Sequence, residues 1–215
     1  MKKTYLFFIT LVLSFVIASP IANAQGTLKI YPGWNLVDYN VIDGMSIPEK
    51  NIRAIYLYKQ GGNEYLGGNF NAFRDVVTNL SSNTSNRAYI EDAPVWVYYD
   101  GKEMSINLKE SVFFQAQKRL LAQSWNFVSF TNELSGKSLA QVKGDCNIEK
   151  VYNFNANTQE WQRISGNGDM TGQTFVFKDW SNYLGSGLLV KVTNNNCTLN
   201  FSESSTASQI PNLPN

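Results

Sequence analysis

The sequence predicts a mainly β protein (α+β) of two tandem homologous small β modules, each with antiparallel strands and one short helix. The first indication is a repeated motif, because Gly33–Val37 (GWNLV) returns as Ser124–Val128 (SWNFV). The second is composition, since 13% of the residues are aromatic, only 16% are charged and Asn is abundant. Such a balance is typical of β-rich domains whose loops are polar without being charged.

The repeat extends well beyond this motif. Three matches occur in the same order, with offsets of 91, 96 and 93 positions: Trp34 and Trp125, Ile55-Tyr56 and Val151-Tyr152, and Ile106–Leu108 and Leu199–Phe201. Loop insertions produce such a small drift, and three ordered matches indicate a duplication. We therefore expect a first module over residues 25–110, a second over 118–201 and a disordered tail over 202–215.

The N-terminus has the pattern of an export signal. Lys2 and Lys3 precede the apolar stretch Tyr5–Ala18, and Ala22-Asn23-Ala24 matches a signal-peptidase site. The apolar stretch is shorter than the ~20 residues that span a bilayer, which disfavours a retained anchor. The sequence thus predicts a signal peptide over residues 1–24 and an exported protein that is periplasmic, on the cell surface or extracellular, with no membrane span in the mature chain.

Charge argues against a nucleic-acid partner. The whole chain has a formal net charge of +1, and loss of Lys2 and Lys3 makes it −1. Binding to nucleic acid requires a basic surplus gathered on one face. We expect the partner to be a surface protein or a glycan instead.

Alternating residues predict the strands within each module. Ile55 and Leu57 alternate with tyrosines, and residues 151–154 repeat this pattern. Gly61-Gly62-Asn63 and residues 155–157 predict turns into return strands at 64–66 and 160–164. The modules are expected to close with hairpins, the first through the Asp-Gly step at 100–101 and the second through the Asn turn at 194–196.

Helical spacing appears once in each copy. Phe70, Phe73, either Val76 or Val77, and Leu80 recur at intervals that suit one face of an amphipathic helix. Phe177, Trp180 and Leu184 have the same spacing in the second copy. One short helix is therefore expected in each module.

The opening and closing segments resemble a known family. Gly33–Val37, Trp125–Val128, Pro94–Val97 and Gly187–Val190 are similar to the "GWNL" repeats of exported and cell-surface proteins of bacteria and archaea. Two positions depart from that pattern, because Ala93-Pro94 replaces the glycine and Leu189 the tryptophan. The resemblance implies a surface-associated, non-enzymatic module and no catalytic residue.

The two cysteines predict a disulfide. Cys146 and Cys197 both lie in the second copy, and an even pair in an exported chain is most simply bonded. The bond would stabilise the fold by about 4 kcal/mol in the chain-entropy model. Two free buried thiols are the alternative. The repeat maps the cysteines onto Lys50 and Met104, which are expected to be neighbours.

We expect no enzyme activity, no metal and no cofactor. The chain has no histidine, which is the commonest general acid or base and a frequent zinc ligand. Chemistry with carboxylates alone stays open as an alternative, that of a carboxylate-based hydrolase. Its candidate residues sit in or beside turns, where solvated carboxylates are usual: Glu64, Asp100, Glu160 and Asp169.

Aromatic side chains are the candidate ligand contacts, because they can stack on sugar rings or grip a protein. The candidates are Tyr98, Tyr99, Trp161 and Trp180. The aromatics that recur in both copies are instead expected to fill a repeated core: Trp34, Trp125, Tyr56 and Tyr152. The sequence thus favours an exported, non-enzymatic binding or structural protein of the cell envelope, with a secreted carbohydrate-binding protein as the alternative.

Overall fold

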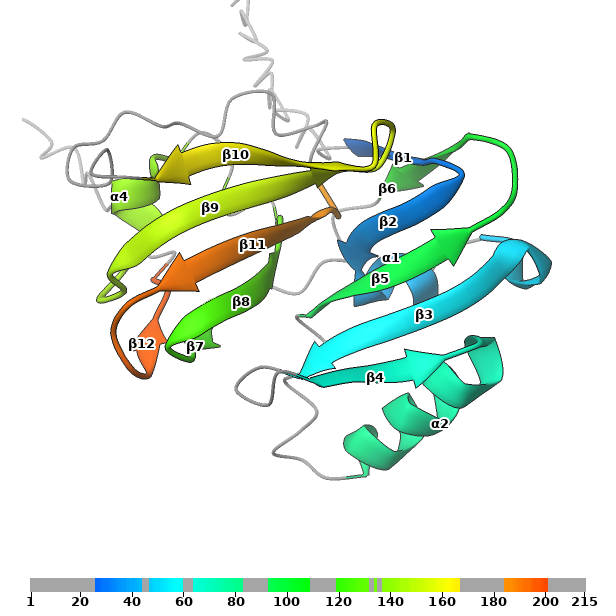
Figure 1. The fold of residues 1–215 in the computed structure, drawn as a ribbon, viewed down its shortest axis with the longest axis horizontal. Helices are drawn as coiled ribbons and strands as arrows, with labels where there is room; N and C mark the ends of the chain where they lie inside the picture. Colours follow the sequence, from blue (N-terminus) through cyan, green and yellow to red (C-terminus); the bar gives the residue numbers. More distant parts are fainter. Residues whose placement is uncertain are drawn as a thin grey trace, which may run out of the picture.

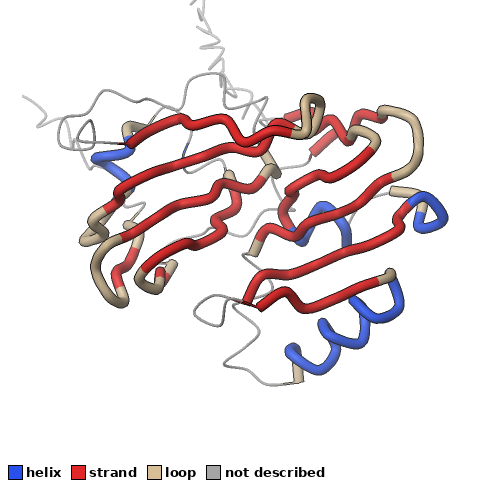
Figure 2. The backbone as a smooth tube through the Cα atoms, in the orientation of Figure 1, coloured by secondary structure: helices blue, strands red, loops and turns tan. Residues whose placement is uncertain are grey.

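Two four-stranded antiparallel sheets lie side by side, each backed by a two-stranded sheet (Figure 1). This computed structural model describes residues 26–43, 47–59, 64–82, 93–108, 119–131, 134, 137–166 and 184–200. The predicted signal peptide and tail lie outside these residues. Within them, the prediction of a mainly β chain of two small modules is confirmed (Figure 2).

The first module has strand order β2-β5-β3-β4 in its large sheet, with β1 and β6 paired in the small one. Its elements are β1 (Gly26–Ile30), β2 (Gly33–Asp38), α1 (Tyr39–Asp43), the 3-10 helix Glu49–Asn51, β3 (Ile52–Lys59), β4 (Glu64–Gly68), α2 (Phe70–Ser81), β5 (Pro94–Tyr99) and β6 (Met104–Leu108). In Figure 1 its large sheet is on the right.

The second module repeats this arrangement, with the order β10-β9-β11-β8 and a β7-β12 pair. Its elements are β7 (Leu120–Leu121), β8 (Ser124–Ser129), α4 (Leu139–Val142), β9 (Ile148–Asn155), β10 (Glu160–Gly166), β11 (Gly187–Val192) and β12 (Cys197–Thr198). Pairing is equivalent down to single residues, since Ile30 faces Met104 and Leu121 faces Cys197. From top to bottom, Figure 1 shows β10, β9, β11 and β8 on the left and their equivalents in the reverse order, β2, β5, β3 and β4, on the right. A rotation that relates the two modules produces this reversal.

The Asn of each Trp-Asn motif is buried and holds the backbone together. Asn35 Oδ1 accepts the Tyr31 N–H at 2.9 Å, while its Nδ2 donates to the carbonyls of Tyr31 at 2.8 Å and Gly33 at 3.1 Å. The second module has the same three bonds, from Asn126 to Ala122 (3.0 and 2.8 Å) and Ser124 (3.1 Å). These bonds fix the turn between the small and the large sheet.

The recurring aromatics do not fill the cores, so that prediction is wrong. Rings of Trp34 and Tyr56 lie 6.1 Å apart, and the equivalent pair in the second module lies 6.0 Å apart, which confirms the register of the repeat. All four side chains are only half-buried, however. Strand period places them opposite the core-facing residues, which are aliphatic side chains such as Ile55 and Val97. The four half-buried aromatic side chains are thus Trp34, Tyr56, Trp125 and Tyr152.

The expected closing hairpins are also wrong. β5 and β6 belong to different sheets, and so do β11 and β12. After Asp100 the chain passes from the large sheet to the small one, and the buried Tyr99 ring fills the space beside Gly101. A Cβ on Gly101 would lie 2.2 Å from the Tyr99 hydroxyl oxygen. The second strand of each pair instead covers the core, as Ile106 and Leu108 do.

One of the two predicted helices is confirmed. α2 covers the predicted positions, begins at the N-cap Asn69, whose side chain accepts the Ala72 N–H, and buries Phe73. The segment 177–184 lies outside the described residues except for Leu184. The sequence pattern missed α4, which is short but has a capping box between Ser138 and Gln141.

The predicted disulfide is present. Cys146 and Cys197 are bonded, with Cα atoms 4.9 Å apart and both side chains fully buried. The bond ties the start of β9 to β12 across the core of the second module. Met104 occupies the register of Cys197 in the first module, whereas the expected proximity of Lys50 to it stays a prediction.

Replacing both cysteines with serine is expected to lower the free energy of unfolding by about 4 kcal/mol, because the unfolded chain regains the entropy of an open loop. Urea unfolding measures the change. A reductant should destabilise the native protein alone and leave the double variant unaffected. Equal sensitivity of the two proteins to reductant would contradict this assignment.

Asn35→Ala and Asn126→Ala should each lower the free energy of unfolding by about 2–4 kcal/mol, because each leaves buried backbone groups without partners. Asn107→Ala, at an exposed position of β6, should cost less than about 0.5 kcal/mol. Denaturant titration of the three variants gives the comparison. A loss at Asn35 no larger than that at Asn107 would show that the buried amide is dispensable.

Candidate functional site

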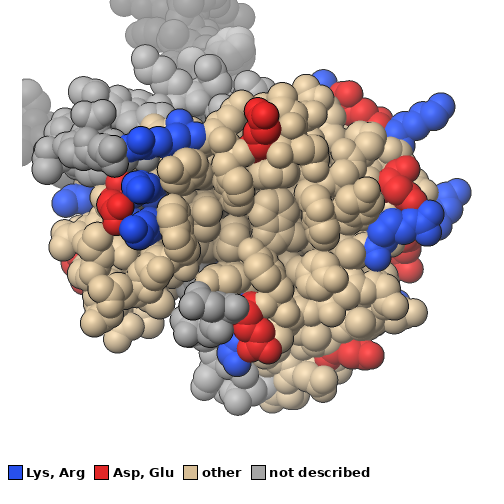
Figure 3. Space-filling model, in the orientation of Figure 1, with Lys and Arg blue, Asp and Glu red and all other residues tan. Residues whose placement is uncertain are grey.

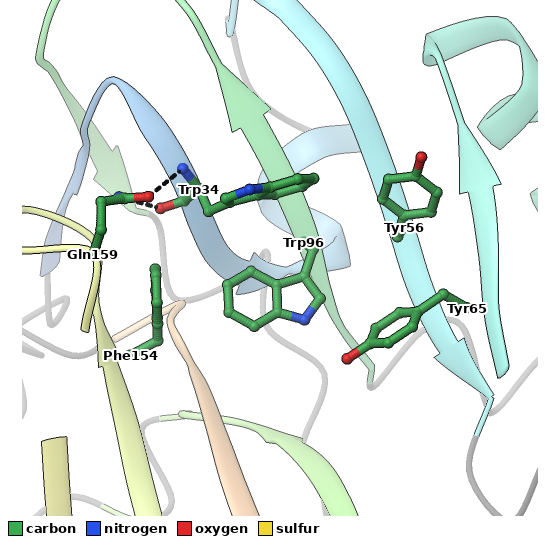
Figure 4. Close-up of a pocket in the computed structure, with 6 residues that line it drawn as sticks. All are labelled: Trp34, Tyr56, Tyr65, Trp96, Phe154 and Gln159. Atoms are coloured by element: carbon green, nitrogen blue, oxygen red, sulfur yellow. Dashed lines mark hydrogen bonds between the residues drawn. The ribbon is translucent and has the colours of Figure 1, made fainter. Parts of the chain in front are cut away.

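A cavity of about 500 Å³ opens where the aromatic outer faces of the two large sheets meet (Figure 4). We call it the aromatic cleft. The described residues that line it are Trp34, Tyr56, Tyr65, Trp96, Phe154 and Gln159. The first four come from β2, β3, β4 and β5 of the first module, and the other two come from β9 and the β9–β10 turn of the second. The cleft therefore depends on both modules.

The rings of the cleft pack edge to face. Trp34 and Trp96 have centroids 6.2 Å apart at 85°, and Trp96 and Phe154 are 4.8 Å apart at 79°. Each such pair contributes about 0.5–1.5 kcal/mol beyond the burial of its area. Trp34 and Tyr56 are tilted at 44° instead, and together these rings line the walls of the cleft (Figure 4).

Trp96 is the ring that joins the two modules. It lies on β5 of the first module, yet its centroid is within 6.2 Å of Phe127 and 5.6 Å of Trp161 on the second, in addition to Phe154. Tyr58 makes another contact across the boundary, 5.2 Å from Phe127. Aromatic contacts between sheets thus hold the walls of the cleft in place.

Two hydrogen bonds of Gln159 link the β9–β10 turn to the first module. Its Oε1 accepts the Trp34 N–H at 2.8 Å and its Nε2 donates to the Trp34 carbonyl at 2.9 Å. Gly33, at φ +100°, allows this approach, since a Cβ there would lie 2.8 Å from Gln159 Oε1. Because both polar atoms of the Gln159 side chain make these hydrogen bonds, the surface that the cleft offers to a ligand is mainly aromatic.

The electrostatics of the cleft are neutral. None of its six residues carries a charge. In Figure 3 the Lys, Arg, Asp and Glu side chains surround an uncharged area in the middle of this face. Partial burial raises the pKa of Tyr65, opposed by a hydrogen bond from Trp96. The Tyr65 hydroxyl therefore stays protonated at neutral pH. A charged ligand would find no counter-charge among these residues.

The boundary between the two modules also contains a buried carboxyl group, that of Asp38. The Asp38 N–H donates to the Gly185 carbonyl at 2.7 Å, which links the modules through their backbones. Burial raises the pKa of the Asp38 carboxyl, while hydrogen bonds from Ser129 and Asn40 oppose the shift. Asp38 and Ser129 are equivalent positions of the two copies, so their contact lies close to the pseudo-twofold axis that relates the modules.

The structure separates the predicted ligand contacts. Trp161 is exposed and touches Trp96, and Tyr98 is exposed at the rim, with its ring 5.1 Å from Trp34. Tyr99 is 3% exposed and belongs to the core of the first module, so it does not contact a ligand at this face. Trp180 lies outside the described residues.

Sequence reasoning missed the cleft itself, because it assigned Trp34 and Tyr56 to the core. Phe154 and Tyr65 were read only as parts of strands. A usable signal was present: residues 55–58 and 95–98 alternate between aliphatic and aromatic side chains, which indicates that the aromatic face is a second surface with its own partner.

The candidate carboxylates of a hydrolase lie apart from the cleft lining. Glu64 pairs with Lys59 at 3.7 Å, and Asp100 pairs with Arg53. Glu160 starts β10 at an exposed position, and Asp169 lies outside the described residues. Among the described residues, no group of three or more His, Cys, Asp or Glu side chains could hold a metal ion, and no helix is long and apolar enough to cross a membrane.

Comparison with known proteins adds no assignment. The chain matches no protein-family model, no curated protein and no solved structure.

Asp38→Asn should raise the free energy of unfolding at neutral pH. Because burial places the folded-state pKa of Asp38 above its unfolded value of about 3.9, ionisation costs stability as pH rises through the folded pKa. The advantage of the variant should be constant above that pKa and should shrink as pH falls toward 4. Urea unfolding from pH 3 to 8 measures it, and a variant less stable than the native protein at pH 7 would contradict this account.

Proposed function

We propose that the protein is an exported, non-catalytic binding protein of the cell envelope or surface, whose ligand sits in the aromatic cleft. The observation that carries this proposal is a neutral cavity of about 500 Å³ walled by five aromatic side chains at the boundary of two modules. Ligand sites are commonly apolar clefts of about 300–1,000 Å³ at such boundaries.

The lining limits the class of ligand. Aromatic walls favour flat apolar faces, and the absence of charge on the six residues favours an uncharged molecule. The two modules are not equivalent in this respect, because Leu189 occupies the repeat position of Trp96. Because Trp96 lines the aromatic cleft, this difference makes the cleft asymmetric.

Export is supported by two independent features. The N-terminal 24 residues have the pattern of a signal peptide, and the Cys146–Cys197 bond suits an oxidising compartment. The resemblance to "GWNL" repeats of surface proteins points the same way. Non-catalytic binding is favoured over carboxylate chemistry because the described carboxylates Glu64 and Asp100 are engaged in ion pairs outside the cleft lining.

A matched pair of variants tests this role. The purified protein is screened on arrays of uncharged oligosaccharides and of uncharged peptides, and binders are titrated by calorimetry. Trp34→Ala removes a wall of the cleft and should weaken binding at least about tenfold. Trp125→Ala removes the equivalent ring, which packs on Tyr152 in the same way but lies outside the cleft lining, and should leave binding unchanged.

Trp34→Ala should lose more stability than Trp125→Ala, because Trp34 also packs on Trp96 and Tyr98. Binding is therefore measured at a temperature where both variants are folded. Equal binding by the two variants would place the ligand elsewhere. A protein that binds no member of either array would overturn the proposed role.

A further inference from the structure

A second cavity, of about 430 Å³, lies beside the aromatic cleft and shares Phe154 with it. We call it the polar cavity. It opens between β1 and β2 of the first module and β9 and β10 of the second. Its described lining mixes apolar side chains with neutral polar ones. Its neutral polar members include Thr27, Tyr31 and Asn153.

Asn153 is the unusual residue of the polar cavity. Its side chain is 5% exposed, and its Oδ1 is buried without a hydrogen-bond partner. The great majority of buried polar atoms are paired, because an unpaired one costs about 1–3 kcal/mol. Asn153 lines the polar cavity, and a ligand that donates a hydrogen bond would satisfy this buried acceptor.

The repeat shows that this polar residue is not required by the fold. Asn153 pairs with Leu188 on β11, and the equivalent residue Leu57 pairs with Val95 on β5. Leu57 is buried in the hydrophobic core of the first module. The same strand position therefore accepts leucine in one copy, and the second copy carries a polar side chain at a cost in stability.

The charge of the lining excludes an ionic ligand. Among the described residues that line the polar cavity, the only charged one is Lys29, and its Nζ is 3.0 Å from Glu103 Oε1. Asn35 also lines it, but its amide is committed to the backbone of Tyr31 and Gly33. Hydroxyl and amide side chains are the remaining polar groups, and most of them can both donate and accept.

We propose that the polar cavity binds one unit of an uncharged saccharide, with a sugar hydroxyl donating to Asn153 Oδ1. Sugar hydroxyls donate and accept on the same atom, which matches the hydroxyls of Thr27 and Tyr31. The apolar face of a sugar ring suits Phe154, which lines the same cavity and is only half-buried. This inference rests on the proposed binding role, but it does not require the aromatic cleft to be the main binding site of the ligand.

The test uses the purified protein and a panel of uncharged sugars: glucose, galactose, mannose, N-acetylglucosamine and their β-1,4- and α-1,4-linked dimers. Saturation-transfer NMR identifies binders, and calorimetry measures their affinity. At least one sugar should bind. Asn153→Leu, which installs the residue of the first module, should weaken its binding at least about tenfold because a sugar hydroxyl is left unpaired.

The unfolding free energy of Asn153→Leu provides the control for folding. Since leucine is the residue at the equivalent core position, the variant should be at least as stable as the native protein. Loss of binding in a stable variant supports the proposal. If no sugar of the panel binds, or if Asn153→Leu binds as the native protein does, the amide is satisfied by water and the proposal is overturned.

Trp34→Ala distinguishes this inference from the proposed function. A sugar that loses affinity in Asn153→Leu but not in Trp34→Ala occupies the polar cavity alone and leaves the aromatic cleft without support. Loss in both variants indicates one glycan that spans the two cavities across Phe154. Loss in Trp34→Ala alone retains the proposed function and rejects the polar cavity as a site.

Discussion

The buried asparagine of each Trp-Asn motif determines how the rest of the molecule is arranged. Asn35 must point inward to satisfy the backbone of Tyr31, so the strand period turns Trp34 outward. On the neighbouring strands the register then places Trp96 and Tyr56 on the same outer face. Each large sheet thus has an aliphatic face that packs inside its module and an aromatic face that water would solvate poorly. Contact between the two aromatic faces follows from this constraint, and the aromatic cleft lies at that contact.

Divergence between the copies is what makes this scaffold specific. A strict duplicate would form each feature of the boundary twice. Two departures prevent this at the boundary: Trp96 against Leu189, and Asn153 against Leu57. A third departure, the bonded pair Cys146 and Cys197, lies within the core of the second module. The first shapes the aromatic cleft, and the second places an unpaired acceptor in the polar cavity. The disulfide strengthens the module whose large sheet supplies Phe154 and Gln159.

Local sequence signals predicted the parts of the fold that depend on local physics. The alternation in residues 55–58 predicted β3, the apolar spacing from Phe70 to Leu80 predicted α2, and the cysteine pair predicted the disulfide. The Asp100-Gly101 signal failed because a turn sequence specifies a change of direction but not the strand that the chain joins next. That choice depends on packing between distant strands, since the second module changes sheets in the same way although Val192 stands at the position of Tyr99.

By itself, the sequence determined the duplication, the mainly β class and the disulfide, because repeats, side-chain periodicity and cysteine number are properties of the chain. Only the tertiary structure decided that the recurring Trp and Tyr residues face outward, since alternation shows two faces without saying which one is inside. It also decided that Trp96 and Phe154, 58 positions apart, share one cavity with Gln159. Such contacts arise from the packing of one module on the other, which no local pattern encodes.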